Sequence, residues 1–256
     1  MRRFAAALLL ALALGPAQAG RSCEARLPDT SAVQRAMELA ARTQAWLDAS
    51  GAQVVVLARA GQDLGKYGLR WSHLGFAYRD GERWRVVHKL NQCGTAVGAL
   101  YRQGLGDFFL DDMFEYRAAI AVPAADVQAR LLPLLQDNAR VARLNQPAYS
   151  VVAYPWAQLY QQSNQWALET LALSQDSAVD SREKAQAWLQ LKGYVPTTLH
   201  LSAFTRLGAR MTAANVAFDD HPNEKRFSDR IETTTVDSTF DWLARSGLAA
   251  QPVVVR

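Results

Sequence analysis

Hydrophobic positions near the start of the folded region recur first at helical and then at strand spacing. In residues 31–49 the apolar side chains follow the helical period, with Thr30 or Ser31 available as a cap and Gly51 as a stop. Residues 53–59 are a β-branched run bounded by polar residues. This order predicts a helix followed by a buried strand.

Two alternating runs follow, at residues 71–78 and 83–90, on either side of Asp80-Gly81. Asp-Gly between alternating strands predicts a hairpin with a two-residue turn. In that register His73 faces His88 across the hairpin, with Gly75 as a small neighbour on the same face. We therefore expect two of the four histidines to meet.

The rest of the chain alternates between helical and extended patterns. It predicts helices at 93–103, 123–137, 164–174, 181–191 and from 238, and extended segments at 115–122, 149–154 and 230–236. No repeat, low-complexity segment or linker interrupts them. The expected fold is a single α+β domain over residues 20–256, with an antiparallel sheet packed against helices and an extra C-terminal α/β segment.

The first nineteen residues have the features of a secretory signal peptide. Arg2 and Arg3 supply the positive start, residues 4–14 the apolar core, and Ala17-Gln18-Ala19 the cleavage site. Gly15-Pro16 ends the apolar run well short of the about twenty residues that a membrane span needs. The sequence predicts an exported protein, periplasmic or secreted, with no membrane insertion after cleavage.

The net charge and the spacing of the glycines limit the classes of ligand that the sequence indicates. Loss of Arg2 and Arg3 lowers the formal net charge from +4 to +2, which is too small to indicate a nucleic-acid partner. Gly104-Leu105-Gly106 matches no phosphate-loop spacing, and we expect no cofactor. The expected partner is an envelope component: a peptide, cell-wall material or a protein.

Two cysteines, Cys23 and Cys93, remain after cleavage. In an oxidising compartment an even pair predicts a disulfide, which would tie the N-terminal segment to the core. The alternative is a free catalytic thiol at Cys93, whose pKa a helix starting there would lower. A zinc site has weak support, because no third ligand follows His73 and His88 at a fixed spacing.

Several segments together carry a resemblance. They are Trp71-Ser72-His73-Leu74-Gly75, Cys93-Gly94, Arg102-Gln103-Gly104-Leu105 and Tyr160-Gln161-Gln162-Ser163-Asn164-Gln165-Trp166. As a set they resemble bacterial domain-of-unknown-function family 2145, which is similar to circularly permuted NlpC-type papain-like proteins. The resemblance implies a papain-like core in which His73 is the general base, His88 orients it, and position 163 carries the nucleophile.

Position 163 departs from that pattern, since the resemblance implies Asn-Cys where this chain has Gln162-Ser163. A serine hydroxyl has a far higher pKa than a thiol and needs base assistance to attack. Ser163 has a structural alternative as the N-cap of the following helix. The resemblance thus implies a relative of hydrolases for amide or peptide bonds, inactive if serine cannot replace cysteine. The alternative is a non-catalytic binding or assembly protein. Trp156 and Trp166 would wall its cleft or pack in its core.

Overall fold

The computed structural model describes residues 29–111 and 113–256. The predicted signal peptide and Cys23 lie outside the described residues. The described residues form eight strands: β1 (Val54–Ala60), β2 (His73–Asp80), β3 (Arg83–Asn91), β4 (Gly98–Gly104), β5 (Glu115–Ala121), β6 (Thr197–His200), β7 (Arg230–Thr233) and β8 (Val253–Val255). The helices there are α1 (Thr30–Ser50), α2 (Leu105–Leu110), α3 (Ala125–Gln136), α4 (Asn138–Ala142), α5 (Ser163–Gln175), α6 (Arg182–Leu191), α7 (Ala203–Thr212), α8 (Asn223–Phe227) and α9 (Val236–Arg245), with a 3-10 turn η1 (Gly65–Tyr67).

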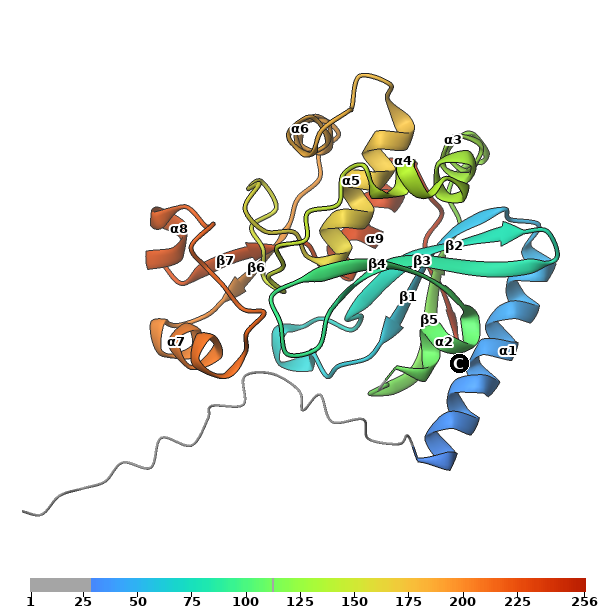
Figure 1. Cartoon of the computed structure of the whole chain (residues 1–256), viewed down its shortest axis with the longest axis horizontal. Helices are drawn as coiled ribbons and strands as arrows, with labels where there is room; N and C mark the ends of the chain where they lie inside the picture. Colours follow the sequence, from blue (N-terminus) through green and yellow to red (C-terminus); the bar gives the residue numbers. More distant parts are fainter. Residues whose placement is uncertain (1–28, 112) are drawn as a thin grey trace, which may run out of the picture.

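A six-stranded sheet in the order β4-β3-β2-β1-β5-β8 forms the centre of the protein, and every pairing is antiparallel. Helices α1 and α2 cover one face and α3, α5 and α9 the other (Figure 1). All residues of β1 are buried, because the strand is covered on both faces. The predicted α+β class with an antiparallel sheet packed against helices is confirmed.

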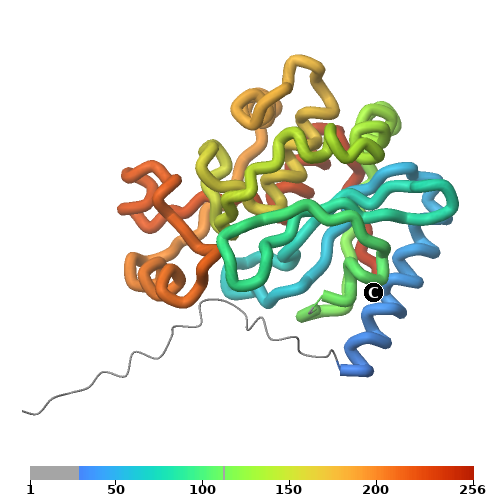
Figure 2. The backbone as a smooth tube through the Cα atoms, in the orientation of Figure 1, coloured from blue at the N-terminus to red at the C-terminus, as the bar shows by residue number. Residues whose placement is uncertain are grey.

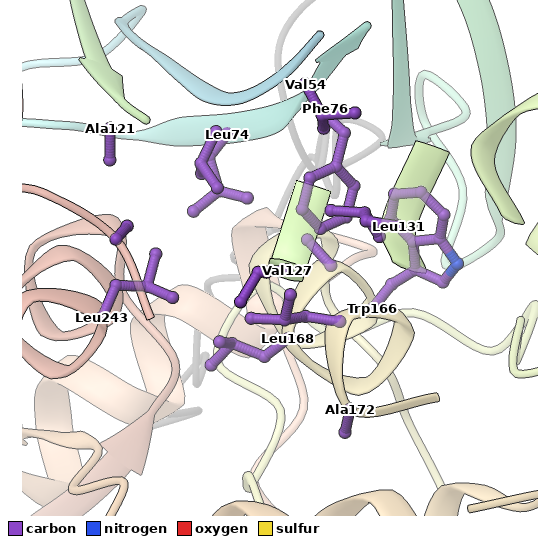
Figure 3. Packing of buried hydrophobic residues seen from close by; sticks show 14 of the residues in the cluster. Val54, Leu74, Phe76, Ala121, Val127, Leu131, Trp166, Leu168, Ala172 and Leu243 are labelled. Atoms are coloured by element: carbon purple, nitrogen blue, oxygen red, sulfur yellow. The ribbon is translucent and has the colours of Figure 1, made fainter. Parts of the chain in front are cut away.

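The larger core lies between the sheet and α5. Trp166 at 0% exposure packs against Phe76, with ring centroids 6.3 Å apart, and Leu131 and Leu168 close the layer (Figure 3). Helix α5 is buried on every side through its first ten residues, so it runs through the protein rather than over its surface (Figure 2). Its first turn can therefore support a buried site.

The predicted hairpin forms, but its register was wrong. Ala77 pairs with Val86 and Asp80 with Arg83, so Gly81 and Glu82 make the turn. Gly81 has φ of 61° and Glu82 has no positive φ, as in a type II′ turn with glycine first. The pairing is shifted by two residues from the prediction. Since side chains alternate with a period of two, the shift keeps His73 and His88 on one face as diagonal neighbours.

Two other predicted elements were wrong. Residues 93–96 form turns rather than a helix, and the following segment is β4, which pairs with β3 through seven residues. The edge of β3 supplied hydrogen bonds that outweighed the local helical pattern. Residues 149–154 are not a strand, although Ala148 makes an isolated bridge with Val97.

A small lobe follows α6 along the chain and contains the two-stranded sheet β6-β7 with α7 and α8 (Figure 1). Its core is a separate cluster formed by Leu199, Leu201, Phe218 and Ile231. We call residues 197–233 the C-terminal lobe. It corresponds to the predicted extra C-terminal segment.

Candidate functional site

His73 and His88 are in direct contact. His73 Nε2 lies 2.8 Å from His88 Nδ1, and the ring centroids are 5.1 Å apart. Gly75 makes this packing possible, because a Cβ there would lie 2.8 Å from His88 Cβ and 3.0 Å from the Val87 carbonyl oxygen. The glycine therefore makes room for the second histidine on the neighbouring strand.

The hydrogen bonds of the pair determine where its protons lie. His88 Nε2 is 2.7 Å from Gln103 Oε1, which can only accept, so this nitrogen carries the proton. In the neutral ring His88 Nδ1 is then an acceptor, and His73 Nε2–H donates to it. His73 Nδ1 keeps its lone pair and has no hydrogen-bond partner among the described residues. The arrangement leaves a basic nitrogen available on His73.

Both histidines are held neutral by their surroundings. Burial is the largest cause that lowers the pKa of His73 well below its usual range, with the Arg59 guanidinium and His88 adding to it. Burial and Arg59 also lower the pKa of His88 to about 4, against an opposing effect of the Gln103 hydrogen bond. Arg59 is itself buried on β1 and binds Asp111 and the Phe108 carbonyl oxygen.

Ser163 is the first residue of α5 and is 5% exposed. The N-cap is Gln162, whose side-chain oxygen accepts from Asn164 N at 2.9 Å. The structural alternative for Ser163, that of helix cap, was therefore wrong. Asn164 Oδ1 in turn accepts from Leu74 N at 3.2 Å, which fastens the start of α5 to β2 beside His73. Ser163 is placed by its neighbours and is not needed to start the helix.

Ser163 and His73 line one cavity of about 420 Å³. Its other lining residues include Asn91, Cys93, Thr95, Asp111, Tyr149 and Asn215. Ser163 Oγ lies 3.3 Å from Tyr149 Oη, and no hydrogen bond among the described residues joins it to His73. The structure thus places His73 and Ser163 at one pocket, with His88 in contact with His73 and the serine hydroxyl paired to Tyr149.

Two further predictions concern the walls of this pocket. Cys93 lies in the wall, but the helix that would lower its pKa is absent there, because residues 93–96 form turns. Its pairing with Cys23 stays a prediction. Trp166 is fully buried in the core and Trp156 packs against Tyr194 at 6.0 Å, so neither lines the pocket and the core alternative holds for both.

Comparison with known proteins assigns the chain to a family. The sequence model of the family described as "uncharacterized protein conserved in bacteria (DUF2145)" matches residues 46–243. The chain belongs to this family. The match begins within α1 and ends within α9, so it includes the histidine hairpin, the start of α5 and the C-terminal lobe. No curated protein and no solved structure matches the chain, and the permuted papain-like core stays a prediction.

A buried polar network supports the start of α5 in this DUF2145 protein. Gln161 Oε1 accepts from Lys89 Nζ at 2.7 Å, and Gln161 Nε2 donates to Glu169. Glu169 also pairs with Arg182 at 2.8 Å and accepts from Gln186 at 2.8 Å. Burial lowers the pKa of Lys89 to about 7. Both polar atoms of the Gln161 side chain have hydrogen-bond partners, which fixes the residues just before Ser163.

Sequence reasoning missed Gln103, Tyr149, Arg59 and Lys89 as parts of the site. One signal was available: residues 161–165, which span the start of α5, are five consecutive uncharged polar residues, and all five are buried. A polar run of that kind at a helix start indicates a satisfied internal network. Nothing in the local sequence around Tyr149 indicated its contact with Ser163.

Two features are absent from the described part of the chain. No three His, Cys, Asp or Glu residues within it are placed to hold a metal ion. No helix in the same residues has the length and apolar character that a bilayer crossing needs.

Proposed function

We propose that this DUF2145 protein is an exported periplasmic relative of papain-like hydrolases whose pocket binds an amide-containing envelope ligand. In the proposal His73 is the general base, His88 orients it, and Ser163 is the nucleophile. The observation that supports this most is the directed chain Gln103–His88–His73, which leaves His73 Nδ1 available in the same cavity as Ser163. A general base needs that free nitrogen and a fixed ring.

The reaction would begin as His73 Nδ1 takes the proton from Ser163 Oγ while the oxygen attacks the carbonyl carbon of the ligand. In the proposal, backbone N–H groups at the start of α5 stabilise the resulting oxyanion. The His73 imidazolium then gives its proton to the leaving amine as the C–N bond breaks. Water then attacks the acyl carbon while His73 accepts its proton, the bond to Ser163 Oγ breaks to release the carboxylic acid, and His73 returns the proton to Ser163 Oγ.

Two features of the site make this chemistry slow. The serine hydroxyl is hydrogen-bonded to Tyr149 and must turn toward His73 before it can attack. Burial and Arg59 also disfavour the imidazolium that the reaction creates, because they lower the pKa of His73. We therefore expect turnover far below that of an enzyme with cysteine at position 163.

The Ser163–Tyr149 contact also favours a second candidate, a binding protein that keeps the pocket without the chemistry. In that case the hydroxyls of Tyr149, Ser163 and Thr95 would bind the ligand as hydrogen-bonding groups of the wall. Incubation of the purified protein with cell-wall peptides distinguishes the two. Cleavage products in mass spectra support the hydrolase, whereas calorimetric binding without cleavage supports the binding protein.

The site itself is tested with Ser163→Cys. We expect the introduced thiol to react rapidly with iodoacetamide near neutral pH and to lose that reactivity in Ser163→Cys/His73→Ala, by a factor of about 10² or more. Ser163→Cys/His200→Ala is the matched control, since His200 is exposed on β6. An unreactive thiol, or equal reactivity in all three variants, contradicts the hydrolase-type site.

Two measurements on the unaltered chain test the remaining expectations. Mass spectrometry of the periplasmic fraction should give a mature N-terminus at Gly20, and an intact Met1 there would contradict export by signal cleavage. Cys93 and Cys23 should react with a thiol reagent only after reduction. Reaction of Cys93 before reduction would support the alternative of a catalytic thiol, because Cys93 lines the same cavity.

A further inference from the structure

Helix α7 presents its apolar face to solvent. Phe204, Leu207 and Met211 lie on one side of the helix and are 88%, 58% and 63% exposed. None of the ten residues of α7 is buried. A surface helix of a globular protein ordinarily turns such a stripe toward the core. Here the stripe points the other way.

The inner side of α7 is the small and polar one. Ala209 packs against the core of the C-terminal lobe, and Arg206 forms an ion pair with Asp229 at 2.6 Å. The lobe is therefore complete without the apolar stripe. The stripe adds nothing to folding and is available for an external contact.

Helix α7 itself is positively charged, whereas the C-terminal lobe as a whole has five Lys or Arg and five Asp or Glu residues. Helix α7 contains two arginines and no acidic residue. Within the described residues, Arg206 and Lys225 have carboxylate partners, whereas Arg210, Arg226 and Arg230 form no ion pair. Phe227 of α8 adds a further apolar side chain, 72% exposed, in the same lobe. Apolar side chains beside unpaired cations match an anionic lipid surface, where rings enter the headgroup boundary and cations meet phosphates.

We propose that α7 is an interfacial anchor that lies on an anionic lipid surface without crossing it. The helix is convex and its side chains protrude, which suits a fluid surface better than the complementary groove of a protein partner. The proposal does not depend on the chemistry at Ser163.

The anchor is connected to the candidate site. Residues 213–215 follow α7 directly, and Ala214 and Asn215 line the cavity that contains His73 and Ser163. Asn215 is held there by Asn91 Oδ1 at 3.0 Å and by Val151 N at 2.9 Å. Contact through α7 would place one wall of the pocket at the membrane surface, where envelope ligands are presented.

Vesicle flotation of the purified processed protein tests the anchor, after mass spectrometry has shown that all variants share one N-terminus. The probe is vesicles of phosphatidylethanolamine with phosphatidylglycerol, compared with phosphatidylcholine alone. We expect Phe204→Ser/Leu207→Ser to lower partitioning by about tenfold or more per residue. Leu191→Ser/Val195→Ser is the matched control, since these residues are 83% and 61% exposed beyond α7.

Arg210→Gln should weaken binding only to the vesicles that contain phosphatidylglycerol, and added salt should have the same effect. Absence of binding by the wild-type protein, or an equal loss in the control variant, would overturn the proposal. A wild-type dimer that Phe204→Ser/Leu207→Ser dissociates in analytical ultracentrifugation would also overturn it, in favour of a second copy as the occupant. Thermal melts verify that the variants fold.

Discussion

Two buried histidines of this protein, His73 and His221, differ in whether both ring nitrogens have hydrogen-bond partners. His73 donates through Nε2 to His88, keeps Nδ1 without a partner among the described residues, and lines a cavity. His221 has both nitrogens occupied, Nδ1 by Asp220 at 2.9 Å and Nε2 by the Glu232 carbonyl oxygen at 2.9 Å. Its side chain is fully buried.

The difference separates a ring that can act on a ligand from one that holds the structure together. His221 links the segment before α8 to β7, and Asp220 also accepts from Tyr154 N at 2.8 Å. Burial alone does not distinguish the two rings, since His73 is only 9% exposed. A free ring nitrogen at a cavity is the property that indicates chemistry.

The largest expected effect concerns stability. His221→Ala should lower the free energy of unfolding by about 3–5 kcal/mol, because it leaves the Asp220 carboxylate buried without its partner. His73→Ala should cost only about 1 kcal/mol, since water in the cavity can replace the ring. Urea unfolding of both variants gives the comparison. Equal losses would mean that His73 is a structural residue as well.

The second prediction concerns acid. The pKa of His88 is about 4 in the folded protein and 6.5 as the ordinary value, so the unfolded chain binds more protons between these limits. The contribution of His88 to stability should be complete above pH 6.5 and should fall by roughly 3 kcal/mol as the pH drops toward 4. His88→Gln should reduce the acid slope by that amount, and His73, whose pKa is also lowered by burial, should account for a slope that remains.

Lys89 gives an internal control for that measurement. Its pKa of about 7 lies below the ordinary 10.5, so its contribution rises with pH between these values and lies outside the acid window. The alkaline slope should therefore be the same in His88→Gln and in the wild type. A loss of both slopes in His88→Gln would show a general disruption of β3.

The third prediction concerns the space between the histidine strands. Gly75→Ala places a methyl group 2.8 Å from His88 Cβ and against the Val87 carbonyl oxygen, and backbone on a paired strand cannot move far. We expect a loss of about 2 kcal/mol and a displaced His88. Gly208→Ala is the matched control, because nothing lies within 4 Å of a Cβ there. Equal stability of the two variants in urea would contradict the close packing.

The smallest effect is expected for Gln103→Leu. Gln103 Oε1 accepts from His88 Nε2 and so keeps the His88 proton on that nitrogen. Without this acceptor His88 can carry its proton on Nδ1 instead, and His73 is no longer held in the form that leaves its Nδ1 unprotonated. We expect an about tenfold lower alkylation rate in the Ser163→Cys background, with stability changed by about 1 kcal/mol or less. Gln103→Glu retains an acceptor and should retain most of the rate. An unchanged alkylation rate in Gln103→Leu would show that the His88 ring does not need the Gln103 hydrogen bond to act on His73.

The sequence predicted the strands and helices whose patterns are local. The β1 run, the hairpin and the α5 helix were all visible in the spacing of apolar residues. The register was not, because Asp80-Gly81 and Gly81-Glu82 both offer a two-residue turn and the difference lies in which turn residue takes the positive φ. The helix expected after Cys93 failed because β3 needed a partner strand, a long-range requirement.

The sequence predicted the candidate-site residues whose type, spacing or resemblance indicated a role. His73, His88 and Ser163 followed from the hairpin and from resemblance; His73 and Ser163 line one cavity, and His88 contacts His73. Their partners did not follow, since Gln103, Tyr149 and Arg59 reach the site from β4, a loop and β1. The sequence also did not predict that the apolar face of α7 is exposed to solvent, because periodicity shows that a helix is amphipathic but not which face meets the core.

The central claim is that His73 is a neutral imidazole with its proton on Nε2 and a free Nδ1 at the cavity. Long-range ¹H–¹⁵N NMR of the histidine rings tests this claim in the unaltered protein, with His73→Ala providing the assignment. The account predicts that His73 stays in the neutral Nε2–H form from pH 8 down to well below its usual titration range. A ring that titrates near pH 6.5, or that carries its proton on Nδ1, would contradict it.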